Sequence, residues 1–355
     1  MPAALKAAPE KTKSRREYLI FGLIIAALAL TAIFEAVIIF EQKRVNERIE
    51  AQSNAALGKF LKQGHAADTQ AGTDILFRNV RFCWSPNVCI NTRQLTATAL
   101  PLNHGRGVVF DNLKSFLVHV HNADVLITPK TLQGMFNESV FNYPGSKLRN
   151  LTVGIEKTGR ENHIKLAGSL DYIFWIPFEM DTNLSVDHKN NNLVISVNTL
   201  KVFGFIPATW LLQLKPFNLD KLLPLPANQY LTVRHNLMLV KPFGLFPPPR
   251  INGNMDSISV MPAMISLRFS GQDPQFTPPL QSGEPNFIYL QGGNAQFGQI
   301  QMLDTHVQVN DQNPRNLFQF SLMNYLHYLP ISKVKLLDNG AAVLQMPDHQ
   351  LNNDN

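Results

Sequence analysis

The chain has 355 residues, of which 45% are hydrophobic and 16% charged, and its formal net charge is +6. This length and apolar content suffice for one large or two ordinary domains with a real core. Five lysines and arginines lie within the first 16 residues, so the rest of the chain is close to neutral. The charge pattern therefore excludes an electrostatic basis for nucleic-acid binding by the main part of the chain.

Residues 18–40 are almost entirely apolar, and Glu35 is their only charged residue. A helix of this length spans roughly 35 Å, which exceeds a bilayer core of about 30 Å. Because no small-residue cleavage site follows, we expect an uncleaved transmembrane helix, with a cleaved signal peptide as the alternative. The basic residues 1–17 then form a cytoplasmic tail by the positive-inside rule, and the main domain lies on the other side of the membrane.

The stretch at residues 41–72 is polar and ends in a glycine-bounded segment, which predicts a helical stalk and a linker. Within residues 73–270 the hydrophobic pattern changes to a period of two, as in Phe116-Leu117-Val118-His119-Val120 and in residues 193–197. Clusters of Gly, Pro and Asn separate these runs. Alternation with such punctuation predicts antiparallel strands joined by short turns.

The two cysteines, Cys83 and Cys89, are separated by a segment that contains Pro86 and Asn87. A turn at these residues would bring the thiols within bridging distance. We therefore predict a disulfide bond and an oxidising compartment, with two unrelated buried thiols as the alternative. The Cys-x5-Cys spacing is not typical of zinc sites, and no metal is expected.

Two stretches have helical rather than strand-like patterns. Thr128 precedes Pro129 as a capping residue precedes the first turn of a helix. The apolar positions that follow have the spacing i, i+3, i+4, i+8: Leu132, Met135, Phe136 and Val140. A second helix is expected within residues 207–223, where Pro216 interrupts the pattern.

The C-terminal part begins with residues 271–286, which are polar and Pro-rich and are interpreted as a linker. Residues 287–347 contain further alternating runs and a predicted helix over 316–328, and they predict a C-terminal β-rich unit. This unit is either a separate small domain or an extension of the preceding sheet. Residues 348–355 are polar and are expected to form a disordered tail.

Five segments in residues 124–270 resemble, in order, parts of one known family. They are DVLITPKTLQGMF (124–136), LRNLTVGIE (148–156), HIKLAGSL (163–170), FGFIPATWLLQL (203–214) and YLTVRHNLMLV (230–240). They are similar to the first helix start, the first hairpin, the second helix and the following strand of bacterial periplasmic tubular lipid-binding (TULIP-type) domains.

The resemblance implies an α+β fold: a strongly curved antiparallel sheet wrapped around one or two helices, here preceded by the transmembrane helix and followed by the β-rich extension. It also implies a single-pass protein of the bacterial inner membrane, with a periplasmic domain that binds a phospholipid or another long apolar molecule. Envelope lipid transport or homeostasis is the expected role. A non-catalytic structural or scaffolding subunit of an envelope complex, with other envelope proteins as partners, is the alternative.

The expected lipid-binding residues are the apolar side chains of the two predicted helices and of the run at residues 171–178, which is apolar on both faces of a strand. They are Leu132, Met135, Phe136, Val140, Phe174, Ile176, Phe203, Phe205, Trp210 and Leu211. A second group lies in a Pro-rich bend and is predicted to contact a membrane or a partner protein: Phe243, Leu245 and Phe246. Ordinary core packing is the alternative for each of these residues.

No catalytic motif stands out in the sequence, which lacks Gly-x-Ser-x-Gly, His-Glu-x-x-His and a phosphate-binding glycine loop. Ser332 and Lys335 form a lone Ser-x-x-Lys, but a strand would place them on opposite faces. His119 and His121 share a strand face, yet no cysteine or carboxylate neighbours them, so two hydrogen-bonded histidines are expected. The prediction is a binding protein without enzymatic activity and without a cofactor. An envelope hydrolase is the further alternative, and it would need a nucleophile and a base in a shared cleft.

Overall fold

The computed structural model describes residue 44 and residues 72–350, apart from 103–106, 160, 173, 211–230, 235 and 242–245. The chain divides into two compact units, Met1–Gln52 and Ser53–Asn355. Within the first unit the structure describes Arg44, which is helical and exposed. The architecture below is that of the second unit.

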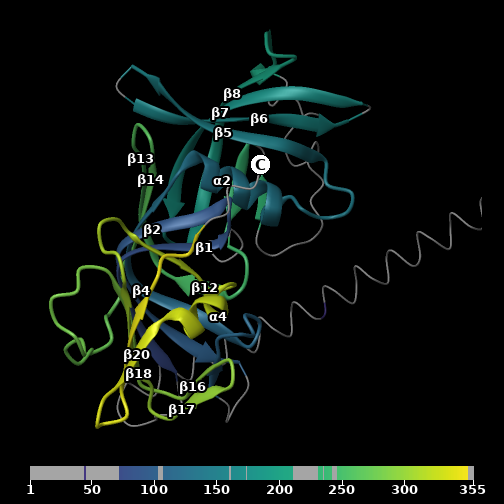
Figure 1. Ribbon diagram of the computed structural model, residues 1–355. Helices are drawn as coiled ribbons and strands as arrows, with labels where there is room; N and C mark the ends of the chain where they lie inside the picture. Colours follow the sequence, from purple (N-terminus) through teal and green to yellow (C-terminus); the bar gives the residue numbers. More distant parts are fainter. Residues whose placement is uncertain are drawn as a thin grey trace, which may run out of the picture. The chain divides into compact units, whose positions relative to one another are not determined.

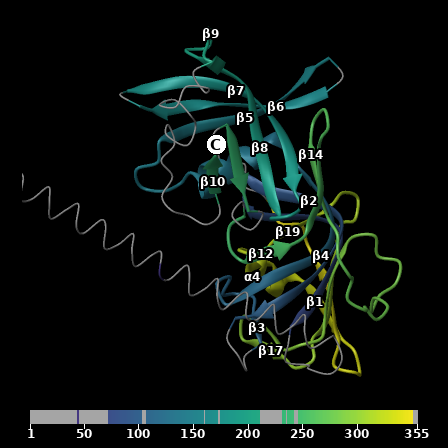
Figure 2. The ribbon, with the colours of Figure 1, turned by 180° about the vertical axis from the view of Figure 1, so that it is seen from behind.

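Three β-sheets make up the described part of this unit (Figures 1 and 2). The large sheet has 11 strands in the order β13-β14-β4-β2-β1-β15-β18-β21-β20, with β12 beside β4 and β19 beside β1. The second sheet has seven strands in the order β10-β11-β8-β7-β6-β5, with β9 beside β8, and the small sheet has the order β17-β16-β3.

Some strands pair with the next strand along the chain as hairpins, and others pair with strands far away in sequence. The large sheet contains β1 (Thr73–Ser85), β2 (Val88–Pro101), β4 (Phe116–Ile127), β12 (Arg250–Gly253), β13 (Met255–Val260), β14 (Ile265–Phe269), β15 (Phe287–Gln291), β18 (His306–Asp311), β19 (Phe318–Ser321), β20 (Lys333–Leu336) and β21 (Ala342–Met346). The second sheet contains β5 (Leu148–Thr158), β6 (Glu161–Asp171), β7 (Trp175–Asp187), β8 (Asn192–Val202), β9 (Ile206–Pro207), β10 (Leu231–Arg234) and β11 (Leu237–Val240). The small sheet contains β3 (Val108–Val109), β16 (Ala295–Phe297) and β17 (Ile300–Met302).

Helix α2 (Pro129–Met135) joins the large sheet to the second sheet and continues into a π-turn, η1 (Phe136–Val140). The Thr128 hydroxyl accepts a hydrogen bond from the Thr131 backbone N–H at 3.1 Å. Pro129 occupies the first turn, where a backbone N–H would have no partner within the helix, so its absence is tolerated. Leu132 and Met135 are buried as α2 packs against β2 and β5. The predicted start of this helix is confirmed.

The large sheet branches at Asn79. This residue has a φ of 52°, in the left-handed region that asparagine tolerates better than most side chains. On one side of it β1 pairs with β15, and on the other side β1 pairs in parallel with β19. The Asn79 amide donates to the Pro285 carbonyl at 2.9 Å, which fixes the kink. One edge of β1 therefore pairs with two strands, β15 before Asn79 and β19 after it.

The expected linker at 271–286 lies along a mixed face of the large sheet, where Phe276 and Leu280 pack against a small buried hydrophobic cluster of the strands. Asp273 accepts hydrogen bonds from Thr96 and from Asn122 there. The Gln281 backbone N–H donates to the Gln308 side chain at 2.9 Å, and that of Thr277 to a side chain of β15 at 2.7 Å. Because β15 and β18, from the C-terminal range 287–347, pair within the large sheet, this range extends the sheet.

The predicted fold, a curved sheet wrapped around one or two long helices, is wrong. The described chain is mostly β, and its two α-helices, α2 and α4 (Tyr325–Tyr328), are short. The first part of the helix expected over 316–328 is strand β19 instead. Phe318 and Phe320 alternate with polar residues there, and the segment pairs in parallel with β1. Only its end is helical, as α4 followed by the 3-10 turn η5 (Leu329–Ile331). Most of the second predicted helix, from 211 onward, lies outside the described residues, and the preceding Ile206–Pro207 is strand β9.

The expectation of a single-pass inner-membrane protein with a periplasmic domain is also corrected. Within the described residues, no helix combines the length and the apolar character that crossing a bilayer requires. The span expected at 18–40 lies outside those residues, as do nearly all of the expected tail and stalk.

Candidate ligand-binding cavity

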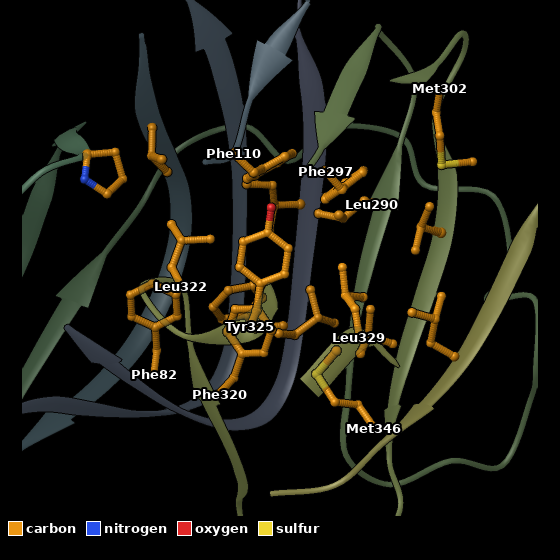
Figure 3. Close-up of a pocket in the computed structure, with 18 of the residues that line it drawn as sticks. Phe82, Phe110, Leu290, Phe297, Met302, Phe320, Leu322, Tyr325, Leu329 and Met346 are labelled. Atoms are coloured by element: carbon orange, nitrogen blue, oxygen red, sulfur yellow. The ribbon is translucent and has the colours of Figure 1, made fainter. Parts of the chain in front are cut away.

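A cavity of about 450 Å³ lies against the apolar face of the large sheet (Figure 3). Its wall consists of side chains from β1, β2, β4, β15, β18 and β21. Side chains from the small sheet, β12, β19, α4, η5 and β20 line the rest of the cavity. This volume falls within the range of about 300–1,000 Å³ that is usual for small-molecule sites.

The alternation of β15 and β18 explains why one face of the wall is apolar. Ile288 and Leu290 line the cavity, and so do Val307 and Val309, whereas the residues between them face the 271–285 segment. In β1 the alternation reverses across Asn79. The inward residues before the kink are Ile75 and Phe77, and those after it are Phe82 and Trp84.

The interior offers little hydrogen bonding. Among the described residues that line the cavity, Gln301 carries a side-chain amide and Tyr325 a hydroxyl, and the rest of the lining is apolar apart from the Trp84 indole N–H, which is buried. Figure 3 shows the Tyr325 ring among Phe110, Phe297 and Phe320. Its ring centroid lies 6.4 Å from that of Phe297 and 6.3 Å from that of Phe320.

Asp111 connects two of the covering elements. Its carboxylate accepts a hydrogen bond from the Tyr325 hydroxyl, in α4, and another at 2.6 Å from the Gly298 backbone N–H, in the β16–β17 turn. Burial, followed by the hydrogen bond and the negative charge of Asp111, raises the pKa of Tyr325. The hydroxyl therefore stays protonated at neutral pH and remains the donor. We call this pair of contacts the Asp111 latch.

The cavity opens at one side. Ile300 in β17 and Val334 and Leu336 in β20 line it, yet they are 60%, 56% and 73% exposed. Strand β20 is the last strand of the large sheet and pairs only with β21 among the described strands. The side of the cavity along β17 and β20 is therefore open to solvent, and we call this side its mouth.

The residues expected to bind lipid lie elsewhere. Leu132, Met135, Phe136 and Val140 are buried in the packing of α2 and η1 against the sheets, and none of them lines the cavity. Leu211 lies outside the described residues.

The expected aromatic residues gather at loops of the second sheet instead. Phe174, Phe203, Phe205 and Trp210 are 57%, 43%, 76% and 60% exposed. The structure brings two of them together, since the rings of Phe174 and Phe203 are 6.4 Å apart. Ile176, the remaining member of the expected set, is half-buried on β7 and does not line the cavity.

Of the expected contact residues in the Pro-rich bend, Phe243 and Leu245 lie outside the described residues. Phe246 is half-buried, and its ring lies 5.3 Å from the indole of Trp84. Phe246 thus packs behind the cavity wall.

The disulfide Cys83–Cys89 is present, as predicted. The two residues are directly opposite each other in the β1–β2 hairpin, where antiparallel strands bring Cα atoms closest, and their Cα atoms are 4.1 Å apart. Cys83 lies between Phe82 and Trp84, so the bond ties together the hairpin end that carries part of the cavity wall.

His119 and His121 lie close together, with ring centroids 4.9 Å apart. His121 Nε2 is 2.8 Å from the Thr98 hydroxyl, which donates to Asp74 at 2.6 Å. Burial lowers the pKa of His119, whose Nδ1 has no hydrogen-bond partner in the described residues. No group of three or more His, Cys, Asp or Glu side chains in that part of the chain is arranged to hold a metal ion.

Sequence reasoning missed the cavity because many of its walls come from residues 287–346, beyond the segments that carry the family resemblance. A usable signal was present: the apolar alternation of residues 288–290, 307–309 and 342–346 predicts strands with one apolar face. Comparison with known proteins adds no further assignment, since no family model, no curated protein and no solved structure matches the chain.

Proposed function

We propose that this protein binds one long apolar molecule, such as a lipid acyl chain, in the cavity against the large sheet. The observation that carries the proposal is the size of the cavity combined with its nearly complete lack of polar groups. The cavity, rather than the resemblance to tubular lipid-binding domains, supports the assignment.

The apolar lining favours an apolar occupant. Apolar surface that is removed from water is stabilised by about 25 cal/mol per Å². A hydrocarbon that covers the lining removes its own surface and that of the cavity from water, so its binding is favourable.

The volume also bounds the size of the ligand. A cavity of about 150 Å³ lined by aliphatic and aromatic side chains holds one benzene molecule. Three such volumes make up the cavity of about 450 Å³, which gives a ligand of roughly 18 non-hydrogen atoms. A single long hydrocarbon chain meets this limit, and the mouth between β17 and β20 leaves room for one end to stay outside.

The proposal is tested by titrating the purified full-length protein with a fluorescent long-chain fatty acid. Leu322→Trp places a larger side chain at a half-buried position of the lining and should weaken binding by tenfold or more. Leu184→Trp is the matched control, because Leu184 is also half-buried against the core but does not line the cavity.

Thermal unfolding of both variants shows whether they fold. Absence of saturable binding by the unmodified protein would refute the proposal, and so would an equal loss of affinity in the two variants. Bound probe should also raise the unfolding temperature, because a ligand that binds only the folded state stabilises it by mass action.

A further inference from the structure

The aromatic side chains that line the cavity gather in one group. Eight of the described lining residues carry an aromatic ring, and three of them lie on β1. The ring of Phe82 is 4.7 Å from that of Trp84 and 5.8 Å from that of Phe77, measured between centroids. Phe320 on β19 lies 6.1 Å from Phe82, and Tyr325 lies 6.3 Å from Phe320. These distances fall within the range of about 4.5–7 Å over which aromatic rings attract one another.

The group continues from α4 into the small sheet and the start of β4. The ring of Phe297 is 6.4 Å from that of Tyr325 and 4.8 Å from that of Phe110, and the last two rings are within 8° of parallel. Phe116 lies 5.4 Å from Phe110. Every aromatic residue in the described lining therefore belongs to one connected set of ring contacts. We call the part of the cavity that these rings line the aromatic end.

The other half of the large sheet contributes no ring to the cavity. Strands β15, β18, β20 and β21 supply nine of the described lining residues, none of them aromatic, with Leu290 and Leu344 as examples. Strand β15 does contain Phe287 and Tyr289, but both pack on the opposite face, against the 271–286 segment. Aromatic and aliphatic side chains are thus segregated within the lining.

The aromatic end is enclosed, whereas the aliphatic half reaches the mouth. None of the eight aromatic residues is exposed, but Val334 and Leu336, in the aliphatic half, are exposed at the mouth. Figure 3 shows Phe320 and Tyr325 on one side of the view and Met302, from the mouth strand β17, on the opposite side. A bound ligand therefore has an inner end among rings and an outer end among aliphatic side chains.

The aromatic end does not favour a charged group. The described residues that line the cavity include no charged side chain. The Tyr325 hydroxyl is already committed to the Asp111 carboxylate, which adds a negative charge beside this end. An ionised group placed there would lose its hydration without gaining a partner. A charged group on the ligand is therefore better placed at the mouth.

We propose that the ligand carries an uncharged aromatic or conjugated ring, which binds at the aromatic end, and an aliphatic chain that extends to the mouth. This inference rests on the proposed function and specifies its ligand class. Rings in offset-stacked or edge-to-face contact gain affinity beyond the area that they bury, roughly twofold to tenfold for each pair. A hydrocarbon without a ring gains only from buried area, so it does not use this additional attraction.

The test compares three acids as competitors of a fluorescent long-chain fatty acid bound to the purified full-length protein. They are ω-phenyldecanoic acid, its isomer para-nonylbenzoic acid, and hexadecanoic acid, which has the same number of carbon atoms. The first acid can place its ring at the aromatic end and its carboxylate at the mouth, whereas the second carries the carboxylate on the ring. We expect ω-phenyldecanoic acid to bind about tenfold more tightly than its isomer. It should also bind at least as tightly as hexadecanoic acid, although the larger apolar surface of a saturated chain favours hexadecanoic acid.

Phe320→Leu removes one ring from the aromatic end and keeps an apolar side chain there. This substitution should reduce the difference between the two isomers to about threefold, and it should change the affinity for hexadecanoic acid less than twofold. Leu344→Met is the matched control, because it makes a volume-conserving change in the aliphatic half and should leave the ratio of affinities unchanged. Thermal unfolding shows whether both variants fold, and the comparison of the isomers on the unmodified protein needs no variant.

The outcomes separate this inference from the proposed function. Failure of the fluorescent fatty acid and of all three acids to bind contradicts the proposed function. Saturable binding with equal affinities for the two isomers, or with tighter binding of para-nonylbenzoic acid, contradicts this inference alone. An equal loss of affinity for all three acids in Phe320→Leu would show that the ring only fills space, and it would overturn the inference as well.

Discussion

Reduction of the Cys83–Cys89 disulfide should lower the free energy of unfolding by an amount set by the length of the loop that the disulfide closes. The two cysteines are 6 residues apart in sequence. The loop-entropy relation for a loop of this size gives about 7.5 cal/mol/K, or about 2 kcal/mol at 25 °C. The loss is limited because the loop is short and the hairpin pairs these residues even without the bond.

Urea unfolding followed by tryptophan fluorescence measures this difference in the oxidised and the reduced protein. The midpoint should fall on reduction, whereas the slope should change little, since the surface exposed on unfolding is nearly the same. Cys83→Ala with Cys89→Ala should behave like the reduced protein and should not respond to the reductant. Equal free energies of unfolding in the oxidised and reduced forms would refute the reasoning.

Three further predictions concern single residues. Asn79→Val should cost about 1–2 kcal/mol more in free energy of unfolding than Asn79→Gly, because a branched side chain resists the left-handed conformation that glycine accepts; equal costs would contradict a role for this kink. Tyr325→Phe should lower the free energy of unfolding by about 1 kcal/mol, as measured by urea titration, since one hydrogen bond to Asp111 is lost. Burial lowers the pKa of His119 and of His349, so the unfolded chain binds their protons more tightly than the folded protein. Stability present above about pH 6.5 should therefore be lost as the pH falls through the lowered folded-state values. His119→Gln should make the unfolding temperature depend less on pH between neutral and mildly acidic conditions. An unchanged dependence of the unfolding temperature on pH would show that His119 does not contribute to it.

Local chemistry in the sequence was enough for the elements that depend on neighbours along the chain. The period-two pattern from residue 73 onward corresponds to strands, and Thr128 with Pro129 begins α2. The cysteine pair forms its disulfide because the turn between them returns the chain on itself. Each of these features is decided within about a dozen residues.

The tertiary structure alone decided which strands meet and where the apolar faces enclose a space. Alternation indicates that a strand has an apolar face, but it does not specify the partner that covers that face. Strand β1 pairs with β2 nearby and also with β15 and β19, more than 200 residues away in sequence. The cavity exists because side chains of these distant strands line one common space, and no local pattern encodes such a long-range choice of partners.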